Sequence, residues 1–358
     1  MTTDRRTLAD SGSAPTDSRP VLRDAEAQTA GRNRNAALDF TKGALVLLMV
    51  VYHCLNYFYH DRTVLKYLHF LPPSFIFITG FLITTVYLTR AGAGDSRVYR
   101  RLFVRGGKLL LIFVGLNLVV HSLFSANYNR RPMGLSFFFD HLYSIFFTGE
   151  ERASVFEVLL PISYLLLLSG ALLRGCRIHR SFLPIVTGGL LALCLVLAAQ
   201  GNLVFNLELL SMGLLGMVVG LVPLQRIDGL ADHRVPVSVA YLAYVAVISR
   251  WYPVYALNII GICLTLLLLY GAGVKLGAQG VVQRRIILLG KYSLLAYIVQ
   301  IGVLQTLFRG LRHLALGEGN LAAGLIVTSV LTVAIIESVD RLRTRSAVLD
   351  RSYKMLFA

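Results

Sequence analysis

Long apolar runs separated by short polar segments dominate the chain. A helix needs roughly 20 mainly apolar residues to cross a bilayer, and shorter helices are tolerated inside a bundle. Ten runs meet this condition, at residues 40–59, 67–88, 103–125, 155–173, 182–199, 203–223, 235–249, 255–273, 286–308 and 319–337. These runs are longer than the roughly 10-residue alternating strands of an outer-membrane barrel. The pattern therefore predicts an all-α, polytopic integral membrane bundle of about ten transmembrane helices.

Lysine and arginine are shared unevenly between the loops on the two sides of this bundle. The loops after even-numbered runs, together with the C-terminal segment, hold more than twice as many as the opposite loops. Because basic loops stay on the cytoplasmic side, both termini are predicted to be cytoplasmic. We expect residues 1–35 to be a disordered tail, 36–340 a transmembrane domain with an outer loop or cap at 126–154, and 341–358 a basic tail.

Two local patterns bear on how the helices pack. Gly213, Gly216 and Gly220 in the sixth run predict a close approach of another helix, because small residues let backbones come together. Pro161 stands one turn after Glu157, and it is expected to kink the helix predicted at 155–173.

The composition agrees with a membrane protein. Hydrophobic residues make up 56% of the chain and charged residues only 15%, whereas a soluble domain has about 25% charged residues. The formal net charge of +16 sits in short loops, where topology and anionic lipid explain it better than nucleic acid does. The four cysteines follow neither a disulfide nor a zinc pattern, so no metal site is predicted. The oligomeric state stays open, a homodimer included.

Titratable residues interrupt the first apolar run. Lys42 and His53 are 11 residues apart, so at about 100° per residue they face the same way, roughly 16 Å apart along the axis. Asp39 lies about 40° from that stripe, and Asn56 and His60 continue it. The stripe predicts one wall of a polar passage, with Asp39 and Lys42 at its cytoplasmic mouth and His53 beyond the midplane.

Simpler explanations remain open for some of these residues. Lys42 could snorkel to the headgroups. A histidine as deep as His53 needs a polar partner, which favours a functional role. Glu157 and Glu208 lie near the outer ends of their runs and are the candidate partners, because a carboxylate would stabilise the charged imidazole. The alternative for each acid is a place among the outer headgroups.

A group of cations follows the second apolar run. Its members are Arg90, Arg97, Arg100, Arg101, Arg105 and Lys108. A positive-inside anchor explains them without any further role. They also suit a polyphosphorylated donor, because the guanidinium fork matches phosphate oxygens. Lys291, near the cytoplasmic end of the ninth run, either snorkels or lines the entry of that donor.

Four segments carry a resemblance to a known family. "LDFTKGALVLLMVVYH" resembles the first span of the acyltransferase family 3 membrane enzymes, in which a histidine follows an Arg-Gly pair. "FIFITGFLITTVYL", "RRLFVRGGKLLLIF" and "LGKYSLLAYIVQ" are similar to that family's second span, its basic entry to the third, and its late Ser-x-x-x-Tyr-x-x-His segment. Lys42, Thr79 and Gln300 stand where the family has Arg, Ser and His. Related branches are the glucan-succinylating and heparan glucosaminide acetyltransferase-like membrane proteins.

The resemblance implies a multi-pass enzyme of the bacterial inner membrane. It would move an acyl group, acetyl or succinyl, from cytoplasmic acyl-CoA to a hydroxyl of an extracytoplasmic glycan or lipid-linked sugar. Acyl-CoA is then a donor substrate, and no tightly bound cofactor is expected. His53 matches the family's essential histidine, and would act as general base on the acceptor or carry the acyl group itself. Tyr52, Asn56 and Thr79 are the candidate donors to the thioester oxygen.

These arguments yield two sets of candidate residues. The predicted catalytic set is His53, Glu157, Glu208 and Asn56. The predicted donor-binding set is Asp39, Lys42, Arg97, Arg100, Arg101, Arg105, Lys108 and Lys291.

Two other classes of function compete with the enzyme. A transporter or flippase of a polar or lipid-linked substrate would also need many spans and buried charges. The sequence shows neither inverted repeats nor paired Gly- or Pro-broken spans, which argues against it. A non-catalytic scaffold would leave the polar stripe of the first run unexplained.

Overall fold

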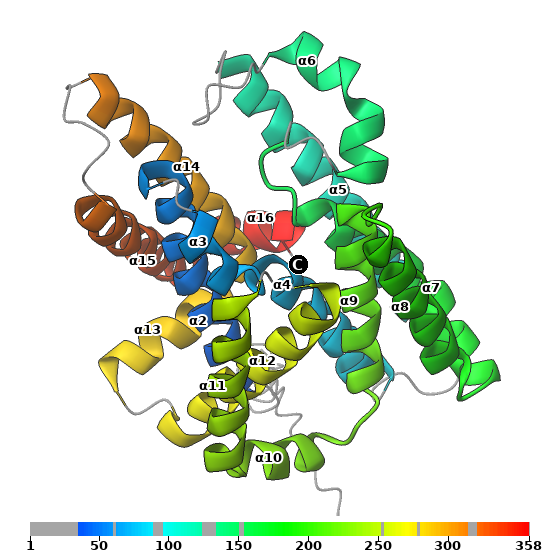
Figure 1. Ribbon diagram of the computed structural model, residues 1–358. Helices are drawn as coiled ribbons and strands as arrows, with labels where there is room; N and C mark the ends of the chain where they lie inside the picture. Colours follow the sequence, from blue (N-terminus) through cyan, green and yellow to red (C-terminus); the bar gives the residue numbers. More distant parts are fainter. Residues whose placement is uncertain are drawn as a thin grey trace, which may run out of the picture. The chain divides into compact units, whose positions relative to one another are not determined.

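The computed structural model describes residues 35–59, 62–88, 96–123, 134–149, 154–251, 254–277, 280–313 and 321–357. Regular structure in these residues is entirely helical (Figure 1), which confirms the all-α prediction. The predicted tail, apart from its last residue, lies outside the described residues, so its disorder stays a prediction.

The elements follow one another along the chain without a strand between them in the described part. The first half contains α2 (Ala36–Cys54), η1 (Leu55–Tyr59), α3 (Arg62–Leu65), η2 (Lys66–Leu68), α4 (Leu71–Leu82), η3 (Ile83–Leu88), α5 (Ser96–Leu123), α6 (Leu135–Asp140), η4 (Ser144–Thr148) and α7 (Leu159–Ile178). The second half contains α8 (Phe182–Ala199), α9 (Phe205–Val219), α10 (Leu224–Asp232), α11 (Arg234–Arg250), α12 (Tyr255–Leu276), α13 (Val281–Lys291), α14 (Ser293–His313), α15 (Leu321–Arg345) and α16 (Ala347–Phe357).

Eight helical segments in the described residues are long and apolar enough to cross a membrane. The count is smaller than the ten runs of the sequence because two of the predicted spans form shorter helices. α9 has 15 residues and α11 has 17, and a 15-residue helix is only about 22 Å long. After Gly220 the chain bends by 100° into α10, and α9 and α10 together would make a ninth, broken span.

Several helix ends meet at one end of the bundle, which we call the basic end. Ala37 at the start of α2 packs with Ala231 of α10 and Tyr270 near the end of α12. Tyr99 at the start of α5 lies under the guanidinium of Arg177 at the end of α7. These are the helix ends that the positive-inside rule places in the cytoplasm, and that orientation stays a prediction.

The glycines of α9 lie where α4 crosses it, as the sequence predicts. A Cβ atom built on Gly216 would lie 2.0 Å from the carbonyl oxygen of Phe77, and one on Gly80 would lie 1.9 Å from that of Gly213. Such distances leave no room for a side chain. Glycine at these positions therefore lets the two backbones touch.

A second crossing of this kind joins α2 and α13, which lie side by side in Figure 1. A Cβ on Gly43 would lie 1.8 Å from the carbonyl oxygen of Ile286, and one on Gly290 would lie 1.7 Å from that of Asp39. The helix that carries His53 is thus fixed at its start by direct backbone contact.

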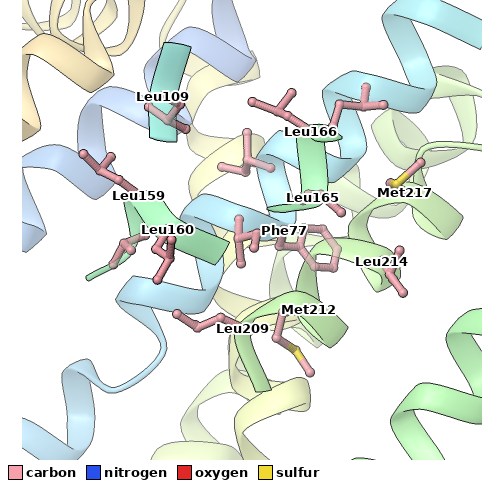
Figure 2. Close-up of a cluster of buried hydrophobic side chains, with 14 of the residues drawn as sticks. Phe77, Leu109, Leu159, Leu160, Leu165, Leu166, Leu209, Met212, Leu214 and Met217 are labelled. Atoms are coloured by element: carbon pink, nitrogen blue, oxygen red, sulfur yellow. The ribbon is translucent and has the colours of Figure 1, made fainter. Parts of the chain in front are cut away.

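The main hydrophobic cluster fills the space between α4, α5, α7 and α9. Figure 2 shows Phe77 of α4 among leucines of α7 and the Leu209, Met212, Leu214 and Met217 side chains of α9. α7 begins only at Leu159, so Pro161 lies in its first turn, where proline is tolerated. The predicted kink at Pro161 is therefore wrong, and Glu157 lies in the turn that precedes the helix.

Candidate active site

His53 lies near the C-terminal end of α2 against aromatic rings. Its ring centroid is 5.4 Å from that of Tyr52, which it meets edge-on, and 6.4 Å from that of Tyr297 in α14. The Nε2 atom is buried and has no hydrogen-bond partner in the described part of the chain. Together with Phe156, these three residues form what we call the histidine niche.

Tyr297 connects the parts of the niche. Its ring lies 6.0 Å from Phe156 and 6.5 Å from Phe75 of α4. Glu157 is close enough to the Tyr297 hydroxyl to interact with it electrostatically. The predicted catalytic set does not contain Tyr297, although it is the tyrosine of the late Ser-x-x-x-Tyr segment, which was the signal that could have identified it.

The backbone at Phe156 is held in an unusual conformation. Its φ angle is +66°, in the left-handed region that residues with a side chain rarely adopt. The turn at this residue brings the Phe156 ring against Tyr297 and sets Glu157 just before α7. Backbone strain of this kind persists only where the surrounding packing enforces it.

Glu208 belongs to another part of the molecule. Its carboxylate is hydrogen-bonded to Asn258 of α12, whose Nδ2 lies 3.3 Å from Nδ1 of His69. Of the two acids predicted as partners of His53, Glu157 is therefore the one connected to the niche, through Tyr297. The catalytic role of either acid stays a prediction.

The three predicted donors to the thioester oxygen have different surroundings. Tyr52 is in the niche. Asn56 is half-buried in the π-helix η1, whose wider turn replaces the α-helical register after Cys54. The angle per residue after Cys54 therefore differs from the roughly 100° of an α-helix. That Asn56 continues the stripe stays a prediction, and His60 lies outside the described residues. Thr79 donates its hydroxyl proton to the carbonyl of Phe75 at 2.8 Å.

Asp39 and Lys42 form an ion pair near the start of α2. Lys42 Nζ lies 2.7 Å from Asp39 Oδ1, and the Asp39 side chain is only 5% exposed. Such a pair keeps both charges inside the protein, since each one offsets the cost of burying the other. The Lys42 ammonium group is therefore paired with a protein carboxylate. A contact with lipid headgroups would be additional to this pair.

Five of the predicted donor-binding cations surround one cavity of about 510 Å³, which we call the basic pocket. Its lining residues are Tyr87, Arg97, Arg100, Arg101, Val104, Arg105 and Lys108. The cations come from the first turns of α5 at spacings of three and four residues, which bring side chains to one side of a helix. Arg105 Nη1 donates a hydrogen bond to the Tyr87 hydroxyl at 2.9 Å.

Lys291 is not part of the basic pocket. Its Nζ atom lies 2.9 Å from Asp340 Oδ1 of α15. Arg90, the remaining cation of the group that follows the second apolar run, lies outside the described residues. The structure thus separates the donor-binding set into the pocket cations, the Asp39–Lys42 pair and the Lys291–Asp340 pair.

Comparison with known protein families identifies the one to which the chain belongs. A family model described as an acyltransferase domain, that of acyltransferase family 3, matches residues 35–337. This range begins just before α2 and ends within α15. No curated protein and no solved structure matches the chain.

Proposed function

Since the chain belongs to acyltransferase family 3 and is an acyltransferase, we propose that it moves an acetyl or succinyl group from acyl-CoA to a sugar hydroxyl. The donor binds on the cytoplasmic side of a bacterial inner membrane. The acceptor is an extracytoplasmic glycan or lipid-linked sugar. The basic end of the bundle then faces the cytoplasm, in agreement with the positive-inside rule.

The observation that carries this proposal is the Nε2 atom of His53, buried and without a hydrogen-bond partner among the described residues. A neutral imidazole has one nitrogen that accepts a proton, and an accepting nitrogen not already engaged can take one from a substrate hydroxyl. The aromatic rings around it keep water away from the reacting groups.

The proposed reaction needs only the two substrates and this imidazole. His53 Nε2 takes the proton of the acceptor hydroxyl while the oxygen attacks the thioester carbonyl carbon. The tetrahedral intermediate then expels CoA as its C–S bond breaks, and the leaving sulfur takes the proton back from the imidazolium. The products are an ester and CoA with a free thiol. Glu157, which interacts with the niche through Tyr297, is the proposed carboxylate that favours the charged imidazolium during this cycle.

The basic pocket is the proposed site of the donor's phosphate groups. Arg101 and Arg105 can each present two parallel N–H groups to phosphate oxygens. The acyl end of the donor, carried on the long pantetheine arm, then extends past the Asp39–Lys42 pair toward His53. The first span separates that pair from His53 by roughly 16 Å along the helix axis.

Sealed vesicles containing the purified protein test the proposal. Acetyl- or succinyl-CoA labelled in the acyl group is supplied on the side of the basic end, and sugars are enclosed on the other side. We expect release of CoA outside and labelled sugar ester inside, neither of which occurs in vesicles without protein. Movement of unmodified sugar across the membrane without CoA release would support the transporter instead.

A further inference from the structure

A second polar cluster lies away from the histidine niche. Glu208 is the fourth residue of α9, Asn258 is the fourth residue of α12, and His69 stands just before α4. All three are therefore within about one turn of a helix start. These starts are at the end of the bundle opposite the basic end, because α12 ends beside the start of α2.

Hydrogen bonds hold the side chain of Asn258 in this cluster. Asn258 Nδ2 can only donate, so Nδ1 of His69, 3.3 Å away, accepts. The Glu208 carboxylate, also bonded to Asn258, keeps further accepting positions.

The carbonyl oxygen of Asn258 points to a ligand independently. Asn258 is only 5% exposed, yet its Oδ1 atom has no hydrogen-bond partner in the described residues. Buried amide oxygens are nearly always paired, so this atom needs an explanation. The two acceptors, the Glu208 carboxylate and Asn258 Oδ1, match the O–H groups of a ligand, which can donate to them.

The cluster and the histidine niche share one hydrophobic cluster. Tyr255, one turn before Asn258, and Tyr297 of the niche both belong to it. Tyr255 is fixed by a hydrogen bond of 2.6 Å between its hydroxyl and that of Ser211. α12 also packs against both α2 and α4, the helices that carry His53 and Phe75. Packed side chains thus connect the cluster with the niche, at the end of the bundle opposite the basic pocket.

We propose that Glu208 and Asn258, the latter held in place by His69, bind the hydroxyl groups of the acceptor sugar and direct one of them toward His53. This inference rests on the proposed function and assigns its acceptor subsite. It gives Glu208 a role in binding the acceptor rather than in tuning His53. Glu208 and Asn258 are acceptor-positioning residues, so their loss changes where the acyl group goes more than whether the donor is cleaved.

The partition of the acyl group between sugar and water tests this proposal. The purified protein in detergent receives labelled acetyl-CoA with methyl β-D-glucopyranoside or methyl N-acetyl-β-D-glucosaminide, and labelled sugar ester and labelled acetate are counted. In Glu208→Gln and Asn258→Ala we expect the ester-to-acetate ratio to fall about tenfold, the usual effect of one lost hydrogen bond to a substrate hydroxyl. The sugar concentration for half-maximal ester formation rises by a similar factor.

Asn206→Ala is the matched control, because Asn206 is on the same helix as Glu208 but donates to the carbonyls of Ile145 and Phe146. It lowers the melting temperature and keeps the wild-type ratio. A wild-type ratio in both cluster variants overturns the subsite and leaves the acyltransfer reaction standing. Ester formation with neither sugar in the wild type overturns the assignment to sugars. The absence of CoA release from the wild type contradicts the proposed function itself.

Discussion

The histidine niche and the basic pocket differ in almost every physical respect. The niche contains two side chains from α2, one from α14 and one from the turn before α7. The Nε2 atom of His53 is buried in it, with no hydrogen-bond partner among the residues that the structure describes. The pocket comes mainly from one helix start, and four of its five cations are exposed. Proton transfer requires a fixed, dry geometry, whereas capture of a polyphosphate works through a field that reaches into water. The two regions are suited to these two tasks.

The difference also appears in how each region depends on the rest of the fold. The pocket cations lie close together in the chain, so α5 alone brings most of them together. The niche joins residues 52, 53, 156 and 297, which only the packed bundle can assemble. Substitutions in the niche are therefore expected to affect the rate of reaction, and substitutions in the pocket the affinity for the donor.

Removal of the imidazole should have the largest effect. We expect His53→Ala to lower acyl transfer by about 10²- to 10⁴-fold, the usual contribution of a general base, while the protein still inserts and folds. CoA release and the melting temperature in detergent measure the two properties. His179→Ala, which removes an exposed histidine at the end of α7, should behave as wild type. Wild-type turnover in His53→Ala would show that the niche has no catalytic role.

Charge reversal at the Asp39–Lys42 pair should have the second-largest effect. Lys42→Glu places a second carboxylate beside the buried Asp39, and breaking such a pair costs about 3–5 kcal/mol. We expect low yield and a clear loss of thermal stability. Lys42→Arg keeps the charge and should retain most of the activity and stability. Equal activity and stability in both variants would mean that Lys42 only snorkels.

Charge reversal in the basic pocket should change the affinity for the donor alone. Arg101→Glu should raise the KM for acyl-CoA about tenfold at low salt, with a smaller effect on kcat, because it removes one charge-assisted contact to phosphate. The effect should shrink as the salt concentration rises. Arg226→Glu, an exposed change in α10 outside the pocket lining, is the control. An equal rise of KM in the two variants would indicate a general effect of surface charge.

The smallest effect concerns the backbone of the niche. At Phe156, both Gly and Ala remove the ring, but only glycine adopts a φ of +66° without cost. Phe156→Gly should therefore be more stable than Phe156→Ala by about 1 kcal/mol, measured by denaturant unfolding in detergent. At the helical residue Phe75 the order should be the reverse, since glycine weakens a helix. The same order at both positions would argue against a strained turn.

Features that depend on the spacing of residues within one segment can be predicted from the sequence. The apolar runs predict the helices, and the glycines of α9 predict a close crossing, because both signals lie within one segment. The contact of Gly43 with α13 is not predictable in this way, since a single glycine does not identify its partner helix. Glu157 and Tyr297 are 140 residues apart in the chain, so only tertiary packing brings them together. The π-helix after Cys54 is likewise not predictable, because the apolar pattern of this run does not distinguish a π-helical turn from an α-helical one.

The backbone contact between Gly43 and Gly290 limits how the protein can move. The two backbones touch at this point, so we expect α13 and the first turns of α2 to move together. His53 and the Asp39–Lys42 pair are on the same helix, so the distance between them stays constant. The flexible arm of the donor must therefore supply the movement that brings the thioester to the His53 ring. The rigid first helix sets the length that this arm has to span.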